Sequence, residues 1–233
     1  MKLAIICAMD EELSQIDGEL GWSPIRSINL AGNTYNEYVY AGHSVISVKC
    51  GIGKVNAAIA TQALLNNFAT DYVINVGIAG NLSQELKFGD VVIANDLVEH
   101  DFDMSSFGVP LGQIVGVNTF SFVADSWLKE LLTRRIQLES NQVVCGRIVS
   151  GDQFIDDAGK AAFLRSEFNA LACEMEGAAI AHVCYANKIP FAVIRSLSDM
   201  AGQDGDAFHS FTELKEMAAK RAALVVKNLL REI

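Results

Sequence analysis

The stretch LACEMEGAAIAHVCYANKIPFAVIRSLSDM, residues 171–200, predicts a strand, a helix and a second strand in succession. Small and apolar residues recur at helical spacing from Gly177 to Ala186, and Pro190 ends the helix because proline cannot continue it. The run 191–197 is apolar and rich in β-branched residues, which is typical of a strand buried on both faces. This stretch therefore predicts an α/β fold.

Carboxylates follow both strands of this stretch. Glu174 and Glu176 come after the first strand, and Asp199 comes after the second. In an open α/β sheet, ligands bind beyond the carboxyl ends of the strands, where these side chains are expected to lie. Two acids beside one cleft are also what general acid–base catalysis requires. The alternative, which stays open for each glutamate, is that the acids only stabilise helix N-termini.

The rest of the chain repeats the alternation of strands and helices. Strands are expected over about 2–8, 71–76, 91–98 and 142–150, and helices over about 9–20, 54–68, 124–139 and 211–231. Residues 35–41 and 44–50, parted by Gly42 and His43, predict an antiparallel hairpin, so the sheet should be mixed. We therefore expect one domain over residues 1–233, a three-layer α/β/α sandwich around a central mixed β-sheet.

The composition limits the partners and the location of the protein. Its net charge is -10, with 18 basic against 28 acidic residues, so we expect neither nucleic acid nor a membrane as partner. The apolar run 3–9 is broken by three acids, too early for a signal peptide or a membrane span. The five cysteines are odd in number and never spaced as CxxC, which favours reduced thiols and a cytoplasmic location.

Three segments resemble cofactor or metal motifs without matching them. The glycine-rich segments CGIGK at 50–54 and GIAGN at 77–81 fit neither GxxxxGK[ST] nor GxGxxG, so we expect no nucleotide cofactor. Close approach of the backbone is the expected reason for the glycines at 77–81. His100 lies among acids at 99–103, but the absence of a second histidine nearby argues against a metal site.

Several segments, taken in order, carry a resemblance to a known family. They are AMDEE at 8–12, GIGKVNAA at 51–58, HD at 100–101 with FG at 107–108, VSGD at 149–152 with FI at 154–155, EME at 174–176 and RSLSD at 195–199. The chain resembles the bacterial 5'-methylthioadenosine/S-adenosylhomocysteine nucleosidases of the nucleoside phosphorylase superfamily over nearly its whole length. The resemblance implies hydrolysis of the N-glycosidic bond to adenine and a 5-thioribose sugar, without a cofactor, in methionine salvage and nucleoside catabolism.

The resemblance also implies roles for single residues. Asp199 is expected to protonate N7 of the leaving purine, with a pKa raised by burial and by the charges of Glu12 and Glu176. Glu12 is expected to bind and deprotonate the attacking water. Glu176 would accept hydrogen bonds from the ribose hydroxyls, and Arg195 would orient that carboxylate and the water. The other substrate-binding residues implied are Ile52, Gly80, Phe154, Ile155, Met175, Ser198 and Phe211.

The same resemblance explains the apolar composition of the loop MSSFGVPLGQIVGV at 104–117. In the family the neighbouring subunit completes the pocket for the 5'-thioalkyl group, which here implicates Met104, Phe107 and Val115. We therefore expect a homodimer whose pockets are shared across the subunits.

Two features depart from the family pattern, and three other functions stay open. Ile78 stands where the family often has a small hydroxyl residue, which makes a bound phosphate less plausible, and the segment after Asp199 is longer and more acidic. The alternatives are a nucleosidase for another purine nucleoside such as aminofutalosine, a phosphate-dependent phosphorylase, and a non-catalytic nucleoside sensor. A sensor would keep the pocket but lose Glu12 or Asp199, and both are present.

Overall fold

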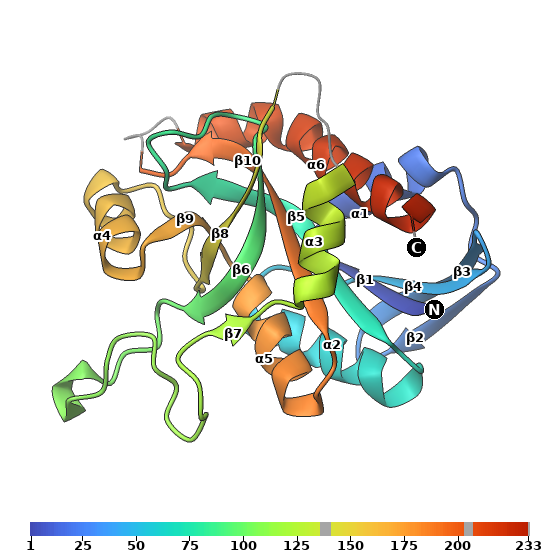
Figure 1. Ribbon diagram of the computed structural model, residues 1–233, viewed down its shortest axis with the longest axis horizontal. Coiled ribbons are helices and arrows are strands. Elements are labelled where there is room, and N and C mark those ends of the chain that lie inside the picture. Colours follow the sequence, from blue (N-terminus) through green and yellow to red (C-terminus); the bar gives the residue numbers. More distant parts are fainter. Residues whose placement is uncertain (136–140, 203–206, 233) are drawn as a thin grey trace.

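The computed structural model describes residues 1–135, 141–202 and 207–232 (Figure 1). Its strands are β1 Lys2–Cys7, β2 Arg26–Leu30, β3 Asn33–Tyr40, β4 His43–Lys49, β5 Tyr72–Asn81, β6 Val91–Glu99, β7 Phe122–Val123, β8 Val143–Ser150, β9 Ala170–Glu174 and β10 Phe191–Met200. Its helices are α1 Asp10–Leu20, α2 Lys54–Asn67, α3 Ser126–Arg135, α4 Ala158–Phe168, α5 Gly177–Asn187 and α6 Ala207–Glu232, with a 3₁₀ turn, η1, at Ser105–Phe107.

The strands form one mixed sheet, as predicted. Their order is β10-β6-β8-β9-β5-β1-β4-β3-β2, and β7 pairs with β6. β10 is parallel to β5 and antiparallel to β6, while β3 and β4 form the predicted antiparallel hairpin. Because β10 pairs with β5 as well as with β6, the strands β5, β10, β6, β8 and β9 close into a ring. The closure was not predicted from the sequence.

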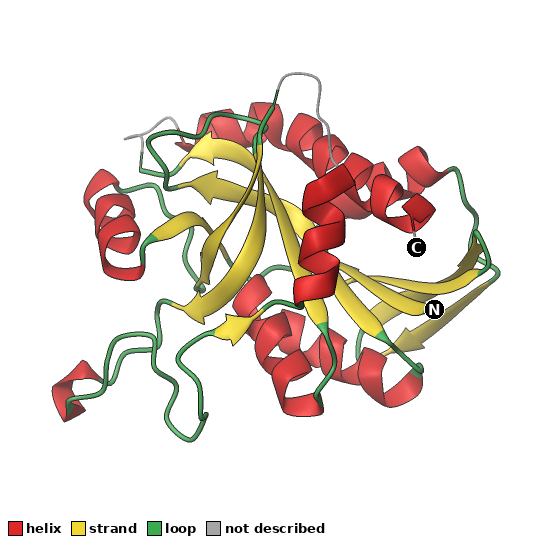
Figure 2. Cartoon of the chain, in the orientation of Figure 1, coloured by secondary structure: helices red, strands yellow, loops and turns green. Residues whose placement is uncertain are grey.

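Helices cover both faces of the sheet, which confirms the three-layer architecture (Figures 1 and 2). Successive residues of a strand point to opposite faces. Accordingly Val73 and Val193 pack with residues of α2 and α5, whereas Ile74 and Ile194 pack with residues of α1, α3 and α6. The two apolar clusters bury these strands on both faces, as their near-continuous hydrophobic sequences predict.

Some boundaries differ from those predicted. The strand expected to end at residue 76 continues as β5 through the glycine-rich segment 77–81. β10 likewise extends past residue 197 and includes Asp199. The edge strand β2 was missed because its sequence, RSINL, is short and half-exposed. The predicted end of the helix at 136–139 lies outside the described residues.

The topology places several chain segments at one edge of the sheet. The strands β1, β4, β5 and β10 are parallel to one another, so their carboxyl ends meet there. α1 begins after β1 and α2 after β4, so their N-termini lie at this edge. β9 is antiparallel to β5, with Cys173 opposite Gly80, so the junction of β9 with α5 also lies beside the end of β5. The acids noticed in the sequence therefore come together, as expected for an α/β sheet.

Candidate active site

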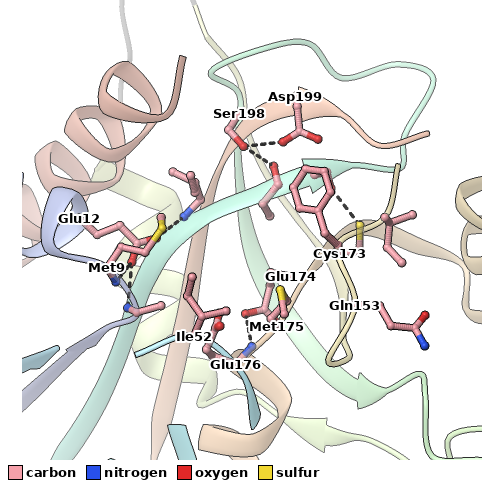
Figure 3. Close-up of a pocket in the computed structure, with 16 residues that line it drawn as sticks. Met9, Glu12, Ile52, Gln153, Cys173, Glu174, Met175, Glu176, Ser198 and Asp199 are labelled. Carbon is pink, nitrogen blue, oxygen red and sulfur yellow. Dashed lines mark hydrogen bonds between the residues drawn. The ribbon is translucent and has the colours of Figure 1, made fainter. Parts of the chain in front are cut away.

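A cavity of about 370 Å³ opens at this edge of the sheet (Figure 3). Its walls come from the start of α1, the glycine turn before α2, the end of β5, the loop after β8, the junction of β9 with α5, and the end of β10. The lining residues are Ala8, Met9, Glu12, Ile52, Ile78, Ala79, Gly80, Gln153, Phe154, Ile155, Cys173, Glu174, Met175, Glu176, Ser198 and Asp199.

Most of the site residues expected from the sequence line this cavity, whereas Arg195, Met104, Phe107 and Val115 do not. Arg195 lies buried behind the wall, and Met104 and Phe107 lie on the loop that projects at the lower left of Figure 1. Phe211 belongs to α6, but its side chain is outside the described part of the chain. Ala8, Met9, Ala79 and Cys173 were missed, since small and apolar residues beside a motif carry no signal of their own, and Gln153 was also missed.

Glu12 reaches the cavity from the first turn of α1 and is held by backbone donors. Its Oε2 accepts hydrogen bonds from Ala8 N–H at 2.9 Å and Met9 N–H at 3.0 Å, and its Oε1 accepts one from Ile78 N–H at 3.0 Å. Burial raises the pKa of Glu12, although the charge of Arg195 and the three backbone donors oppose the rise. The side chain is thus a buried acid in one fixed orientation.

Gly77 makes room for Glu12. A methyl group at Gly77 would lie 2.5 Å from Glu12 Oε1, which is too close for any side chain. Gly80 has a similar reason, because a methyl group there would lie 3.3 Å from both Asp199 Oδ2 and Cys173 Sγ. Close approach to the backbone, the expected reason for these glycines, is confirmed.

Asp199 lies at an irregularity of β10. The pairing of β10 with β5 shifts register between Leu197 and Asp199, so Ser198 is an extra residue in the strand. The Ser198 hydroxyl donates a hydrogen bond of 2.6 Å to Asp199 Oδ1. Burial raises the pKa of Asp199, although the hydrogen bond from Ser198 acts to lower it. The rise in this pKa agrees with the expectation. Its cause is burial, however, and the charges of Glu12 and Glu176 do not contribute to it.

The structure corrects the expected partner of Arg195. Its Nη2 lies 2.5 Å from Glu174 Oε2, in an ion pair with both side chains almost fully buried, and 2.5 Å from Asn75 Oδ1. Glu174 also accepts hydrogen bonds from the Ser150 hydroxyl and from the N–H groups of residues 176 and 177. Burial opposes ionisation of Glu174, yet Arg195 and these donors hold its pKa below its usual value.

Because Arg195 forms its ion pair with Glu174, Glu176 is not the partner of the arginine, and it faces the cavity. Its Oε1 accepts a hydrogen bond of 2.7 Å from Gly53 N–H. Burial, together with the negative charge of Glu174, raises the pKa of Glu176 to about 8. Two glutamates two residues apart thus differ in protonation, and the arginine decides which of them is the anion.

The three acids Glu12, Glu176 and Asp199 come from α1, the start of α5 and β10, and face a cavity with mostly apolar walls. Phe154 and Met175 supply apolar surface beside Ile52 and Ile155. An apolar cavity with a few convergent acids of raised pKa is suited to a neutral, partly aromatic ligand and to proton transfer.

Comparison with known proteins shows the family of the chain. A sequence model of the phosphorylase superfamily matches residues 2–231. The 5'-methylthioadenosine/S-adenosylhomocysteine nucleosidase of Bacillus pumilus is 40% identical over 234 residues, which cover 100% of this chain and 99% of that protein. The chain belongs to this nucleosidase family of the phosphorylase superfamily.

Solved structures of the nucleosidase family have the same fold. The Helicobacter pylori 5'-methylthioadenosine/S-adenosylhomocysteine nucleosidase, in complex with a substituted pyrrolidin-3-ol, superimposes with a TM-score of 0.94 at 35% identity, covering 100% of this chain and 99% of that one. A structure described as futalosine hydrolase of H. pylori gives a TM-score of 0.94 at 34% identity, covering 100% and 98%. The whole nucleosidase fold is therefore present in this chain.

The acids near His100 pair with basic groups. Glu99 and Asp101 accept hydrogen bonds from Lys54 Nζ, and Glu99 also lies 3.3 Å from His182 Nδ1. Within the described residues, no group of three or more His, Cys, Asp or Glu side chains is arranged to hold a metal ion. Over the same part of the chain, no helix has the length and apolar character needed to cross a membrane.

The raised pKa of Glu176 predicts a dependence of stability on pH. Between about 4.5 and about 8, the unfolded chain has released the Glu176 proton while the folded protein keeps it, so stability falls as pH rises through this window. Glu176→Gln has no proton to release, so its free energy of unfolding should not show this decrease. We expect its free energy of unfolding, relative to the parent, to increase from pH 5 to pH 8 by on the order of 2 to 4 kcal/mol.

Urea unfolding at pH 5 and pH 8, at one protein concentration, measures this difference. Glu11→Gln is the control, because Glu11 pairs with Lys215, which lowers its pKa, and so has released its proton throughout the window. Parallel changes in the parent and Glu176→Gln would contradict the prediction.

Proposed function

We propose that the protein hydrolyses the N-glycosidic bond of 5'-methylthioadenosine and S-adenosylhomocysteine, and also of 5'-deoxyadenosine, to adenine and the corresponding sugar. The observation that carries the proposal is the pair Glu12 and Asp199, two buried acids of raised pKa that face one apolar cavity from different elements. The names of the relatives support the same activity.

In the proposed reaction, the bond between the sugar C1' and purine N9 breaks and its electron pair stays with adenine. Asp199 delivers its proton to N7, so that adenine leaves as a neutral base. The ribosyl group develops oxocarbenium character, which the ionised Glu174 in the cavity wall favours electrostatically. Water attacks C1', and its proton passes to Glu12. Glu176 accepts hydrogen bonds from the ribose hydroxyls, and Phe154 and Met175 flank the purine.

Incubation with 5'-methylthioadenosine, with and without phosphate, tests the proposal. We expect adenine and free methylthioribose in both cases, at rates that do not depend on phosphate. Formation of the sugar 1-phosphate would identify a phosphorylase, and tight binding of the nucleoside without turnover would identify a sensor.

A second substrate is supported by one of the comparisons. The structure described as a futalosine hydrolase has the same fold as this chain over its whole length. Aminofutalosine, which shares the adenine and ribose groups, is therefore the alternative substrate. The ratio of kcat/KM for methylthioadenosine and aminofutalosine, measured on the same preparation, decides which of the two is preferred.

We also propose that the protein is a homodimer in which the loop 104–117 of one subunit completes the cavity of the other. Phe107 is 80% exposed and Val115 58% exposed on this loop. Ile52, which lines the cavity, is 54% exposed, and Val55 and Ile59, one turn apart on the following helix α2, are also exposed. Apolar side chains gathered around a cavity mouth and on a projecting loop are typical of surfaces buried between subunits.

Phe107→Ala is expected to weaken binding at the 5'-thioalkyl end more than at the adenine end. Loss of a buried aromatic anchor costs on the order of 2 kcal/mol, or about 30-fold in affinity for a 5'-alkylthio nucleoside. The Kd of adenine should change little. Phe163→Ala is the matched control, because Phe163 is 42% exposed on α4 and does not line the cavity. Sedimentation should show a dimer, and equal losses for both ligands or a fully active monomer would contradict the assignment of the loop.

The proposal extends to location and pathway. All five cysteines, each among the described residues, are free thiols, which supports the cytoplasm as the compartment. The proposed products support a place in methionine salvage, where a thioribose sugar is consumed further.

A further inference from the structure

The proposed sugar-binding carboxylate, Glu176, is oriented by a short glycine turn. Its Oε1 accepts its hydrogen bond from Gly53 N–H, in the turn that precedes α2. Gly51 and Gly53 have φ angles of +85° and +97°, a conformation that residues with a side chain rarely adopt. A turn of this kind has little rigidity of its own, so the direction of the Gly53 N–H depends on the groups that hold its ends.

Lys54, the next residue, fixes the turn through both its backbone and its side chain. Its N–H donates to Asp152 Oδ1 at 2.8 Å, and its ammonium donates to Asp101 Oδ1 at 2.6 Å. Asp101 Oδ2 in turn accepts a hydrogen bond of 2.9 Å from Asp152 N–H. Lys54, Asp101 and Asp152 therefore form a closed ring of hydrogen bonds that joins the turn to the loop after β8.

A second connection runs from Lys54 back to the helix that Glu176 precedes. The ammonium also donates to Glu99 Oε2 at 2.9 Å, and Glu99 Oε1 lies 3.3 Å from His182 Nδ1 on α5. The side chains of Lys54 and Glu99 are only 17% and 12% exposed, so water cannot fully replace the ion pair if one partner is removed. Neither side chain lines the cavity, and any effect on substrate is indirect.

We propose that Lys54 is a positioning residue for recognition of the sugar hydroxyls. Its ammonium, held by Glu99 and Asp101, fixes the Gly53 N–H that orients Glu176. The inference rests on the proposed function in one respect, the assignment of the ribose hydroxyls to Glu176. Removing the ammonium leaves the turn held by the Lys54 N–H bond to Asp152 and by the Asn56 amide, which donates to Ile52 O at 2.7 Å. A small displacement of a substrate-orienting group is costly to the rate.

The test compares Lys54→Met with the parent on 5'-methylthioadenosine and on its 2'-deoxy analogue. We expect kcat/KM to fall about 10-fold for the first substrate and less than about 2-fold for the second, so that discrimination between them is lost. Lys227→Met is the matched control. Lys227 forms a 2.9 Å pair with Glu19 at similar burial, between α6 and α1, and its loss should leave the discrimination unchanged.

The double variant Lys54→Met/Glu176→Gln identifies the route of the effect. If Lys54 acts through Glu176, the double variant should discriminate no less than Glu176→Gln alone. Additive losses of discrimination would overturn the proposal. If Glu176→Gln discriminates as the parent does, the proposed role of Glu176 fails. If it loses discrimination while Lys54→Met does not, only the inference about Lys54 fails.

Thermal unfolding shows whether Lys54→Met is folded. If it is not, Asp101→Asn tests the same ion pair in a second variant. The variant removes the charge nearest to the ammonium and keeps a side chain of the same size. It should lose discrimination in the same direction, by about 3-fold. A folded Asp101→Asn protein with the discrimination of the parent would overturn the proposal.

Discussion

Asp199→Asn is expected to abolish most of the hydrolysis of 5'-methylthioadenosine while binding of adenine survives. The asparagine amide can donate a hydrogen bond to N7, but it cannot deliver a proton, and loss of a general acid typically costs about 10²- to 10⁴-fold in rate. The cavity keeps its apolar walls, so the Kd of adenine should stay within about 3-fold.

The decisive measurement uses a substrate whose leaving group needs no proton. For such a nucleoside, Asp199→Asn should be slowed far less than for methylthioadenosine. Asp125→Asn is the control, since Asp125 accepts a hydrogen bond at the start of α3, away from the cavity. If both substrates were slowed equally, Asp199 would be an orienting residue and not the acid.

The pH profile gives an independent test of the same role. Burial raises the pKa of Asp199, and a general acid works only while it holds its proton. In the parent, kcat should therefore fall as pH rises through this raised pKa. The residual activity of Asp199→Asn should lack that decline, and a decline that persists in the variant would point to another group.

Glu12→Gln is the second change with a large expected effect, a loss of about 10²- to 10⁴-fold in kcat from removal of the base that activates water. The structure adds a cost that the sequence does not show. Both carboxylate oxygens accept hydrogen bonds from backbone N–H groups, two at Oε2 and one at Oε1. A glutamine can present oxygen to only one side, and its amide NH₂ would face the Ile78 N–H, leaving that donor unpaired.

Glu11→Gln separates the chemistry from a general effect of charge. Glu11 is adjacent in sequence, but its side chain points to α6, where Lys215 Nζ lies 2.5 Å from its Oε1. We expect Glu11→Gln to keep a rate within about 2-fold of the parent, as for most surface substitutions. Near-parent turnover by Glu12→Gln, with loss in Glu11→Gln, would reverse the assignment of the two acids.

Much of the fold and the identity of the acids follow from local sequence patterns. The apolar, β-branched run before Asp199 predicts a buried strand, and the small-residue segment after Glu176, ended by Pro190, predicts a covering helix. The motif residues that lie beside strand ends were expected near one site, because parallel strands bring their carboxyl ends to one edge. The type of each element and the position of the acids after the strands depend on residues close together in the chain, so both can be predicted from the sequence.

What the tertiary structure decided depends on groups far apart in the chain. Arg195 pairs with Glu174 and not with Glu176, because β9 and β10 both pair with β5 and bring the arginine to that carboxylate. The glycine-rich segment 77–81 was expected to follow the strand, yet it belongs to β5, where Gly77 and Gly80 leave room for Glu12 and Asp199. Contacts between residues far apart in the chain are determined by strand register and burial, so they cannot be predicted from a local sequence pattern.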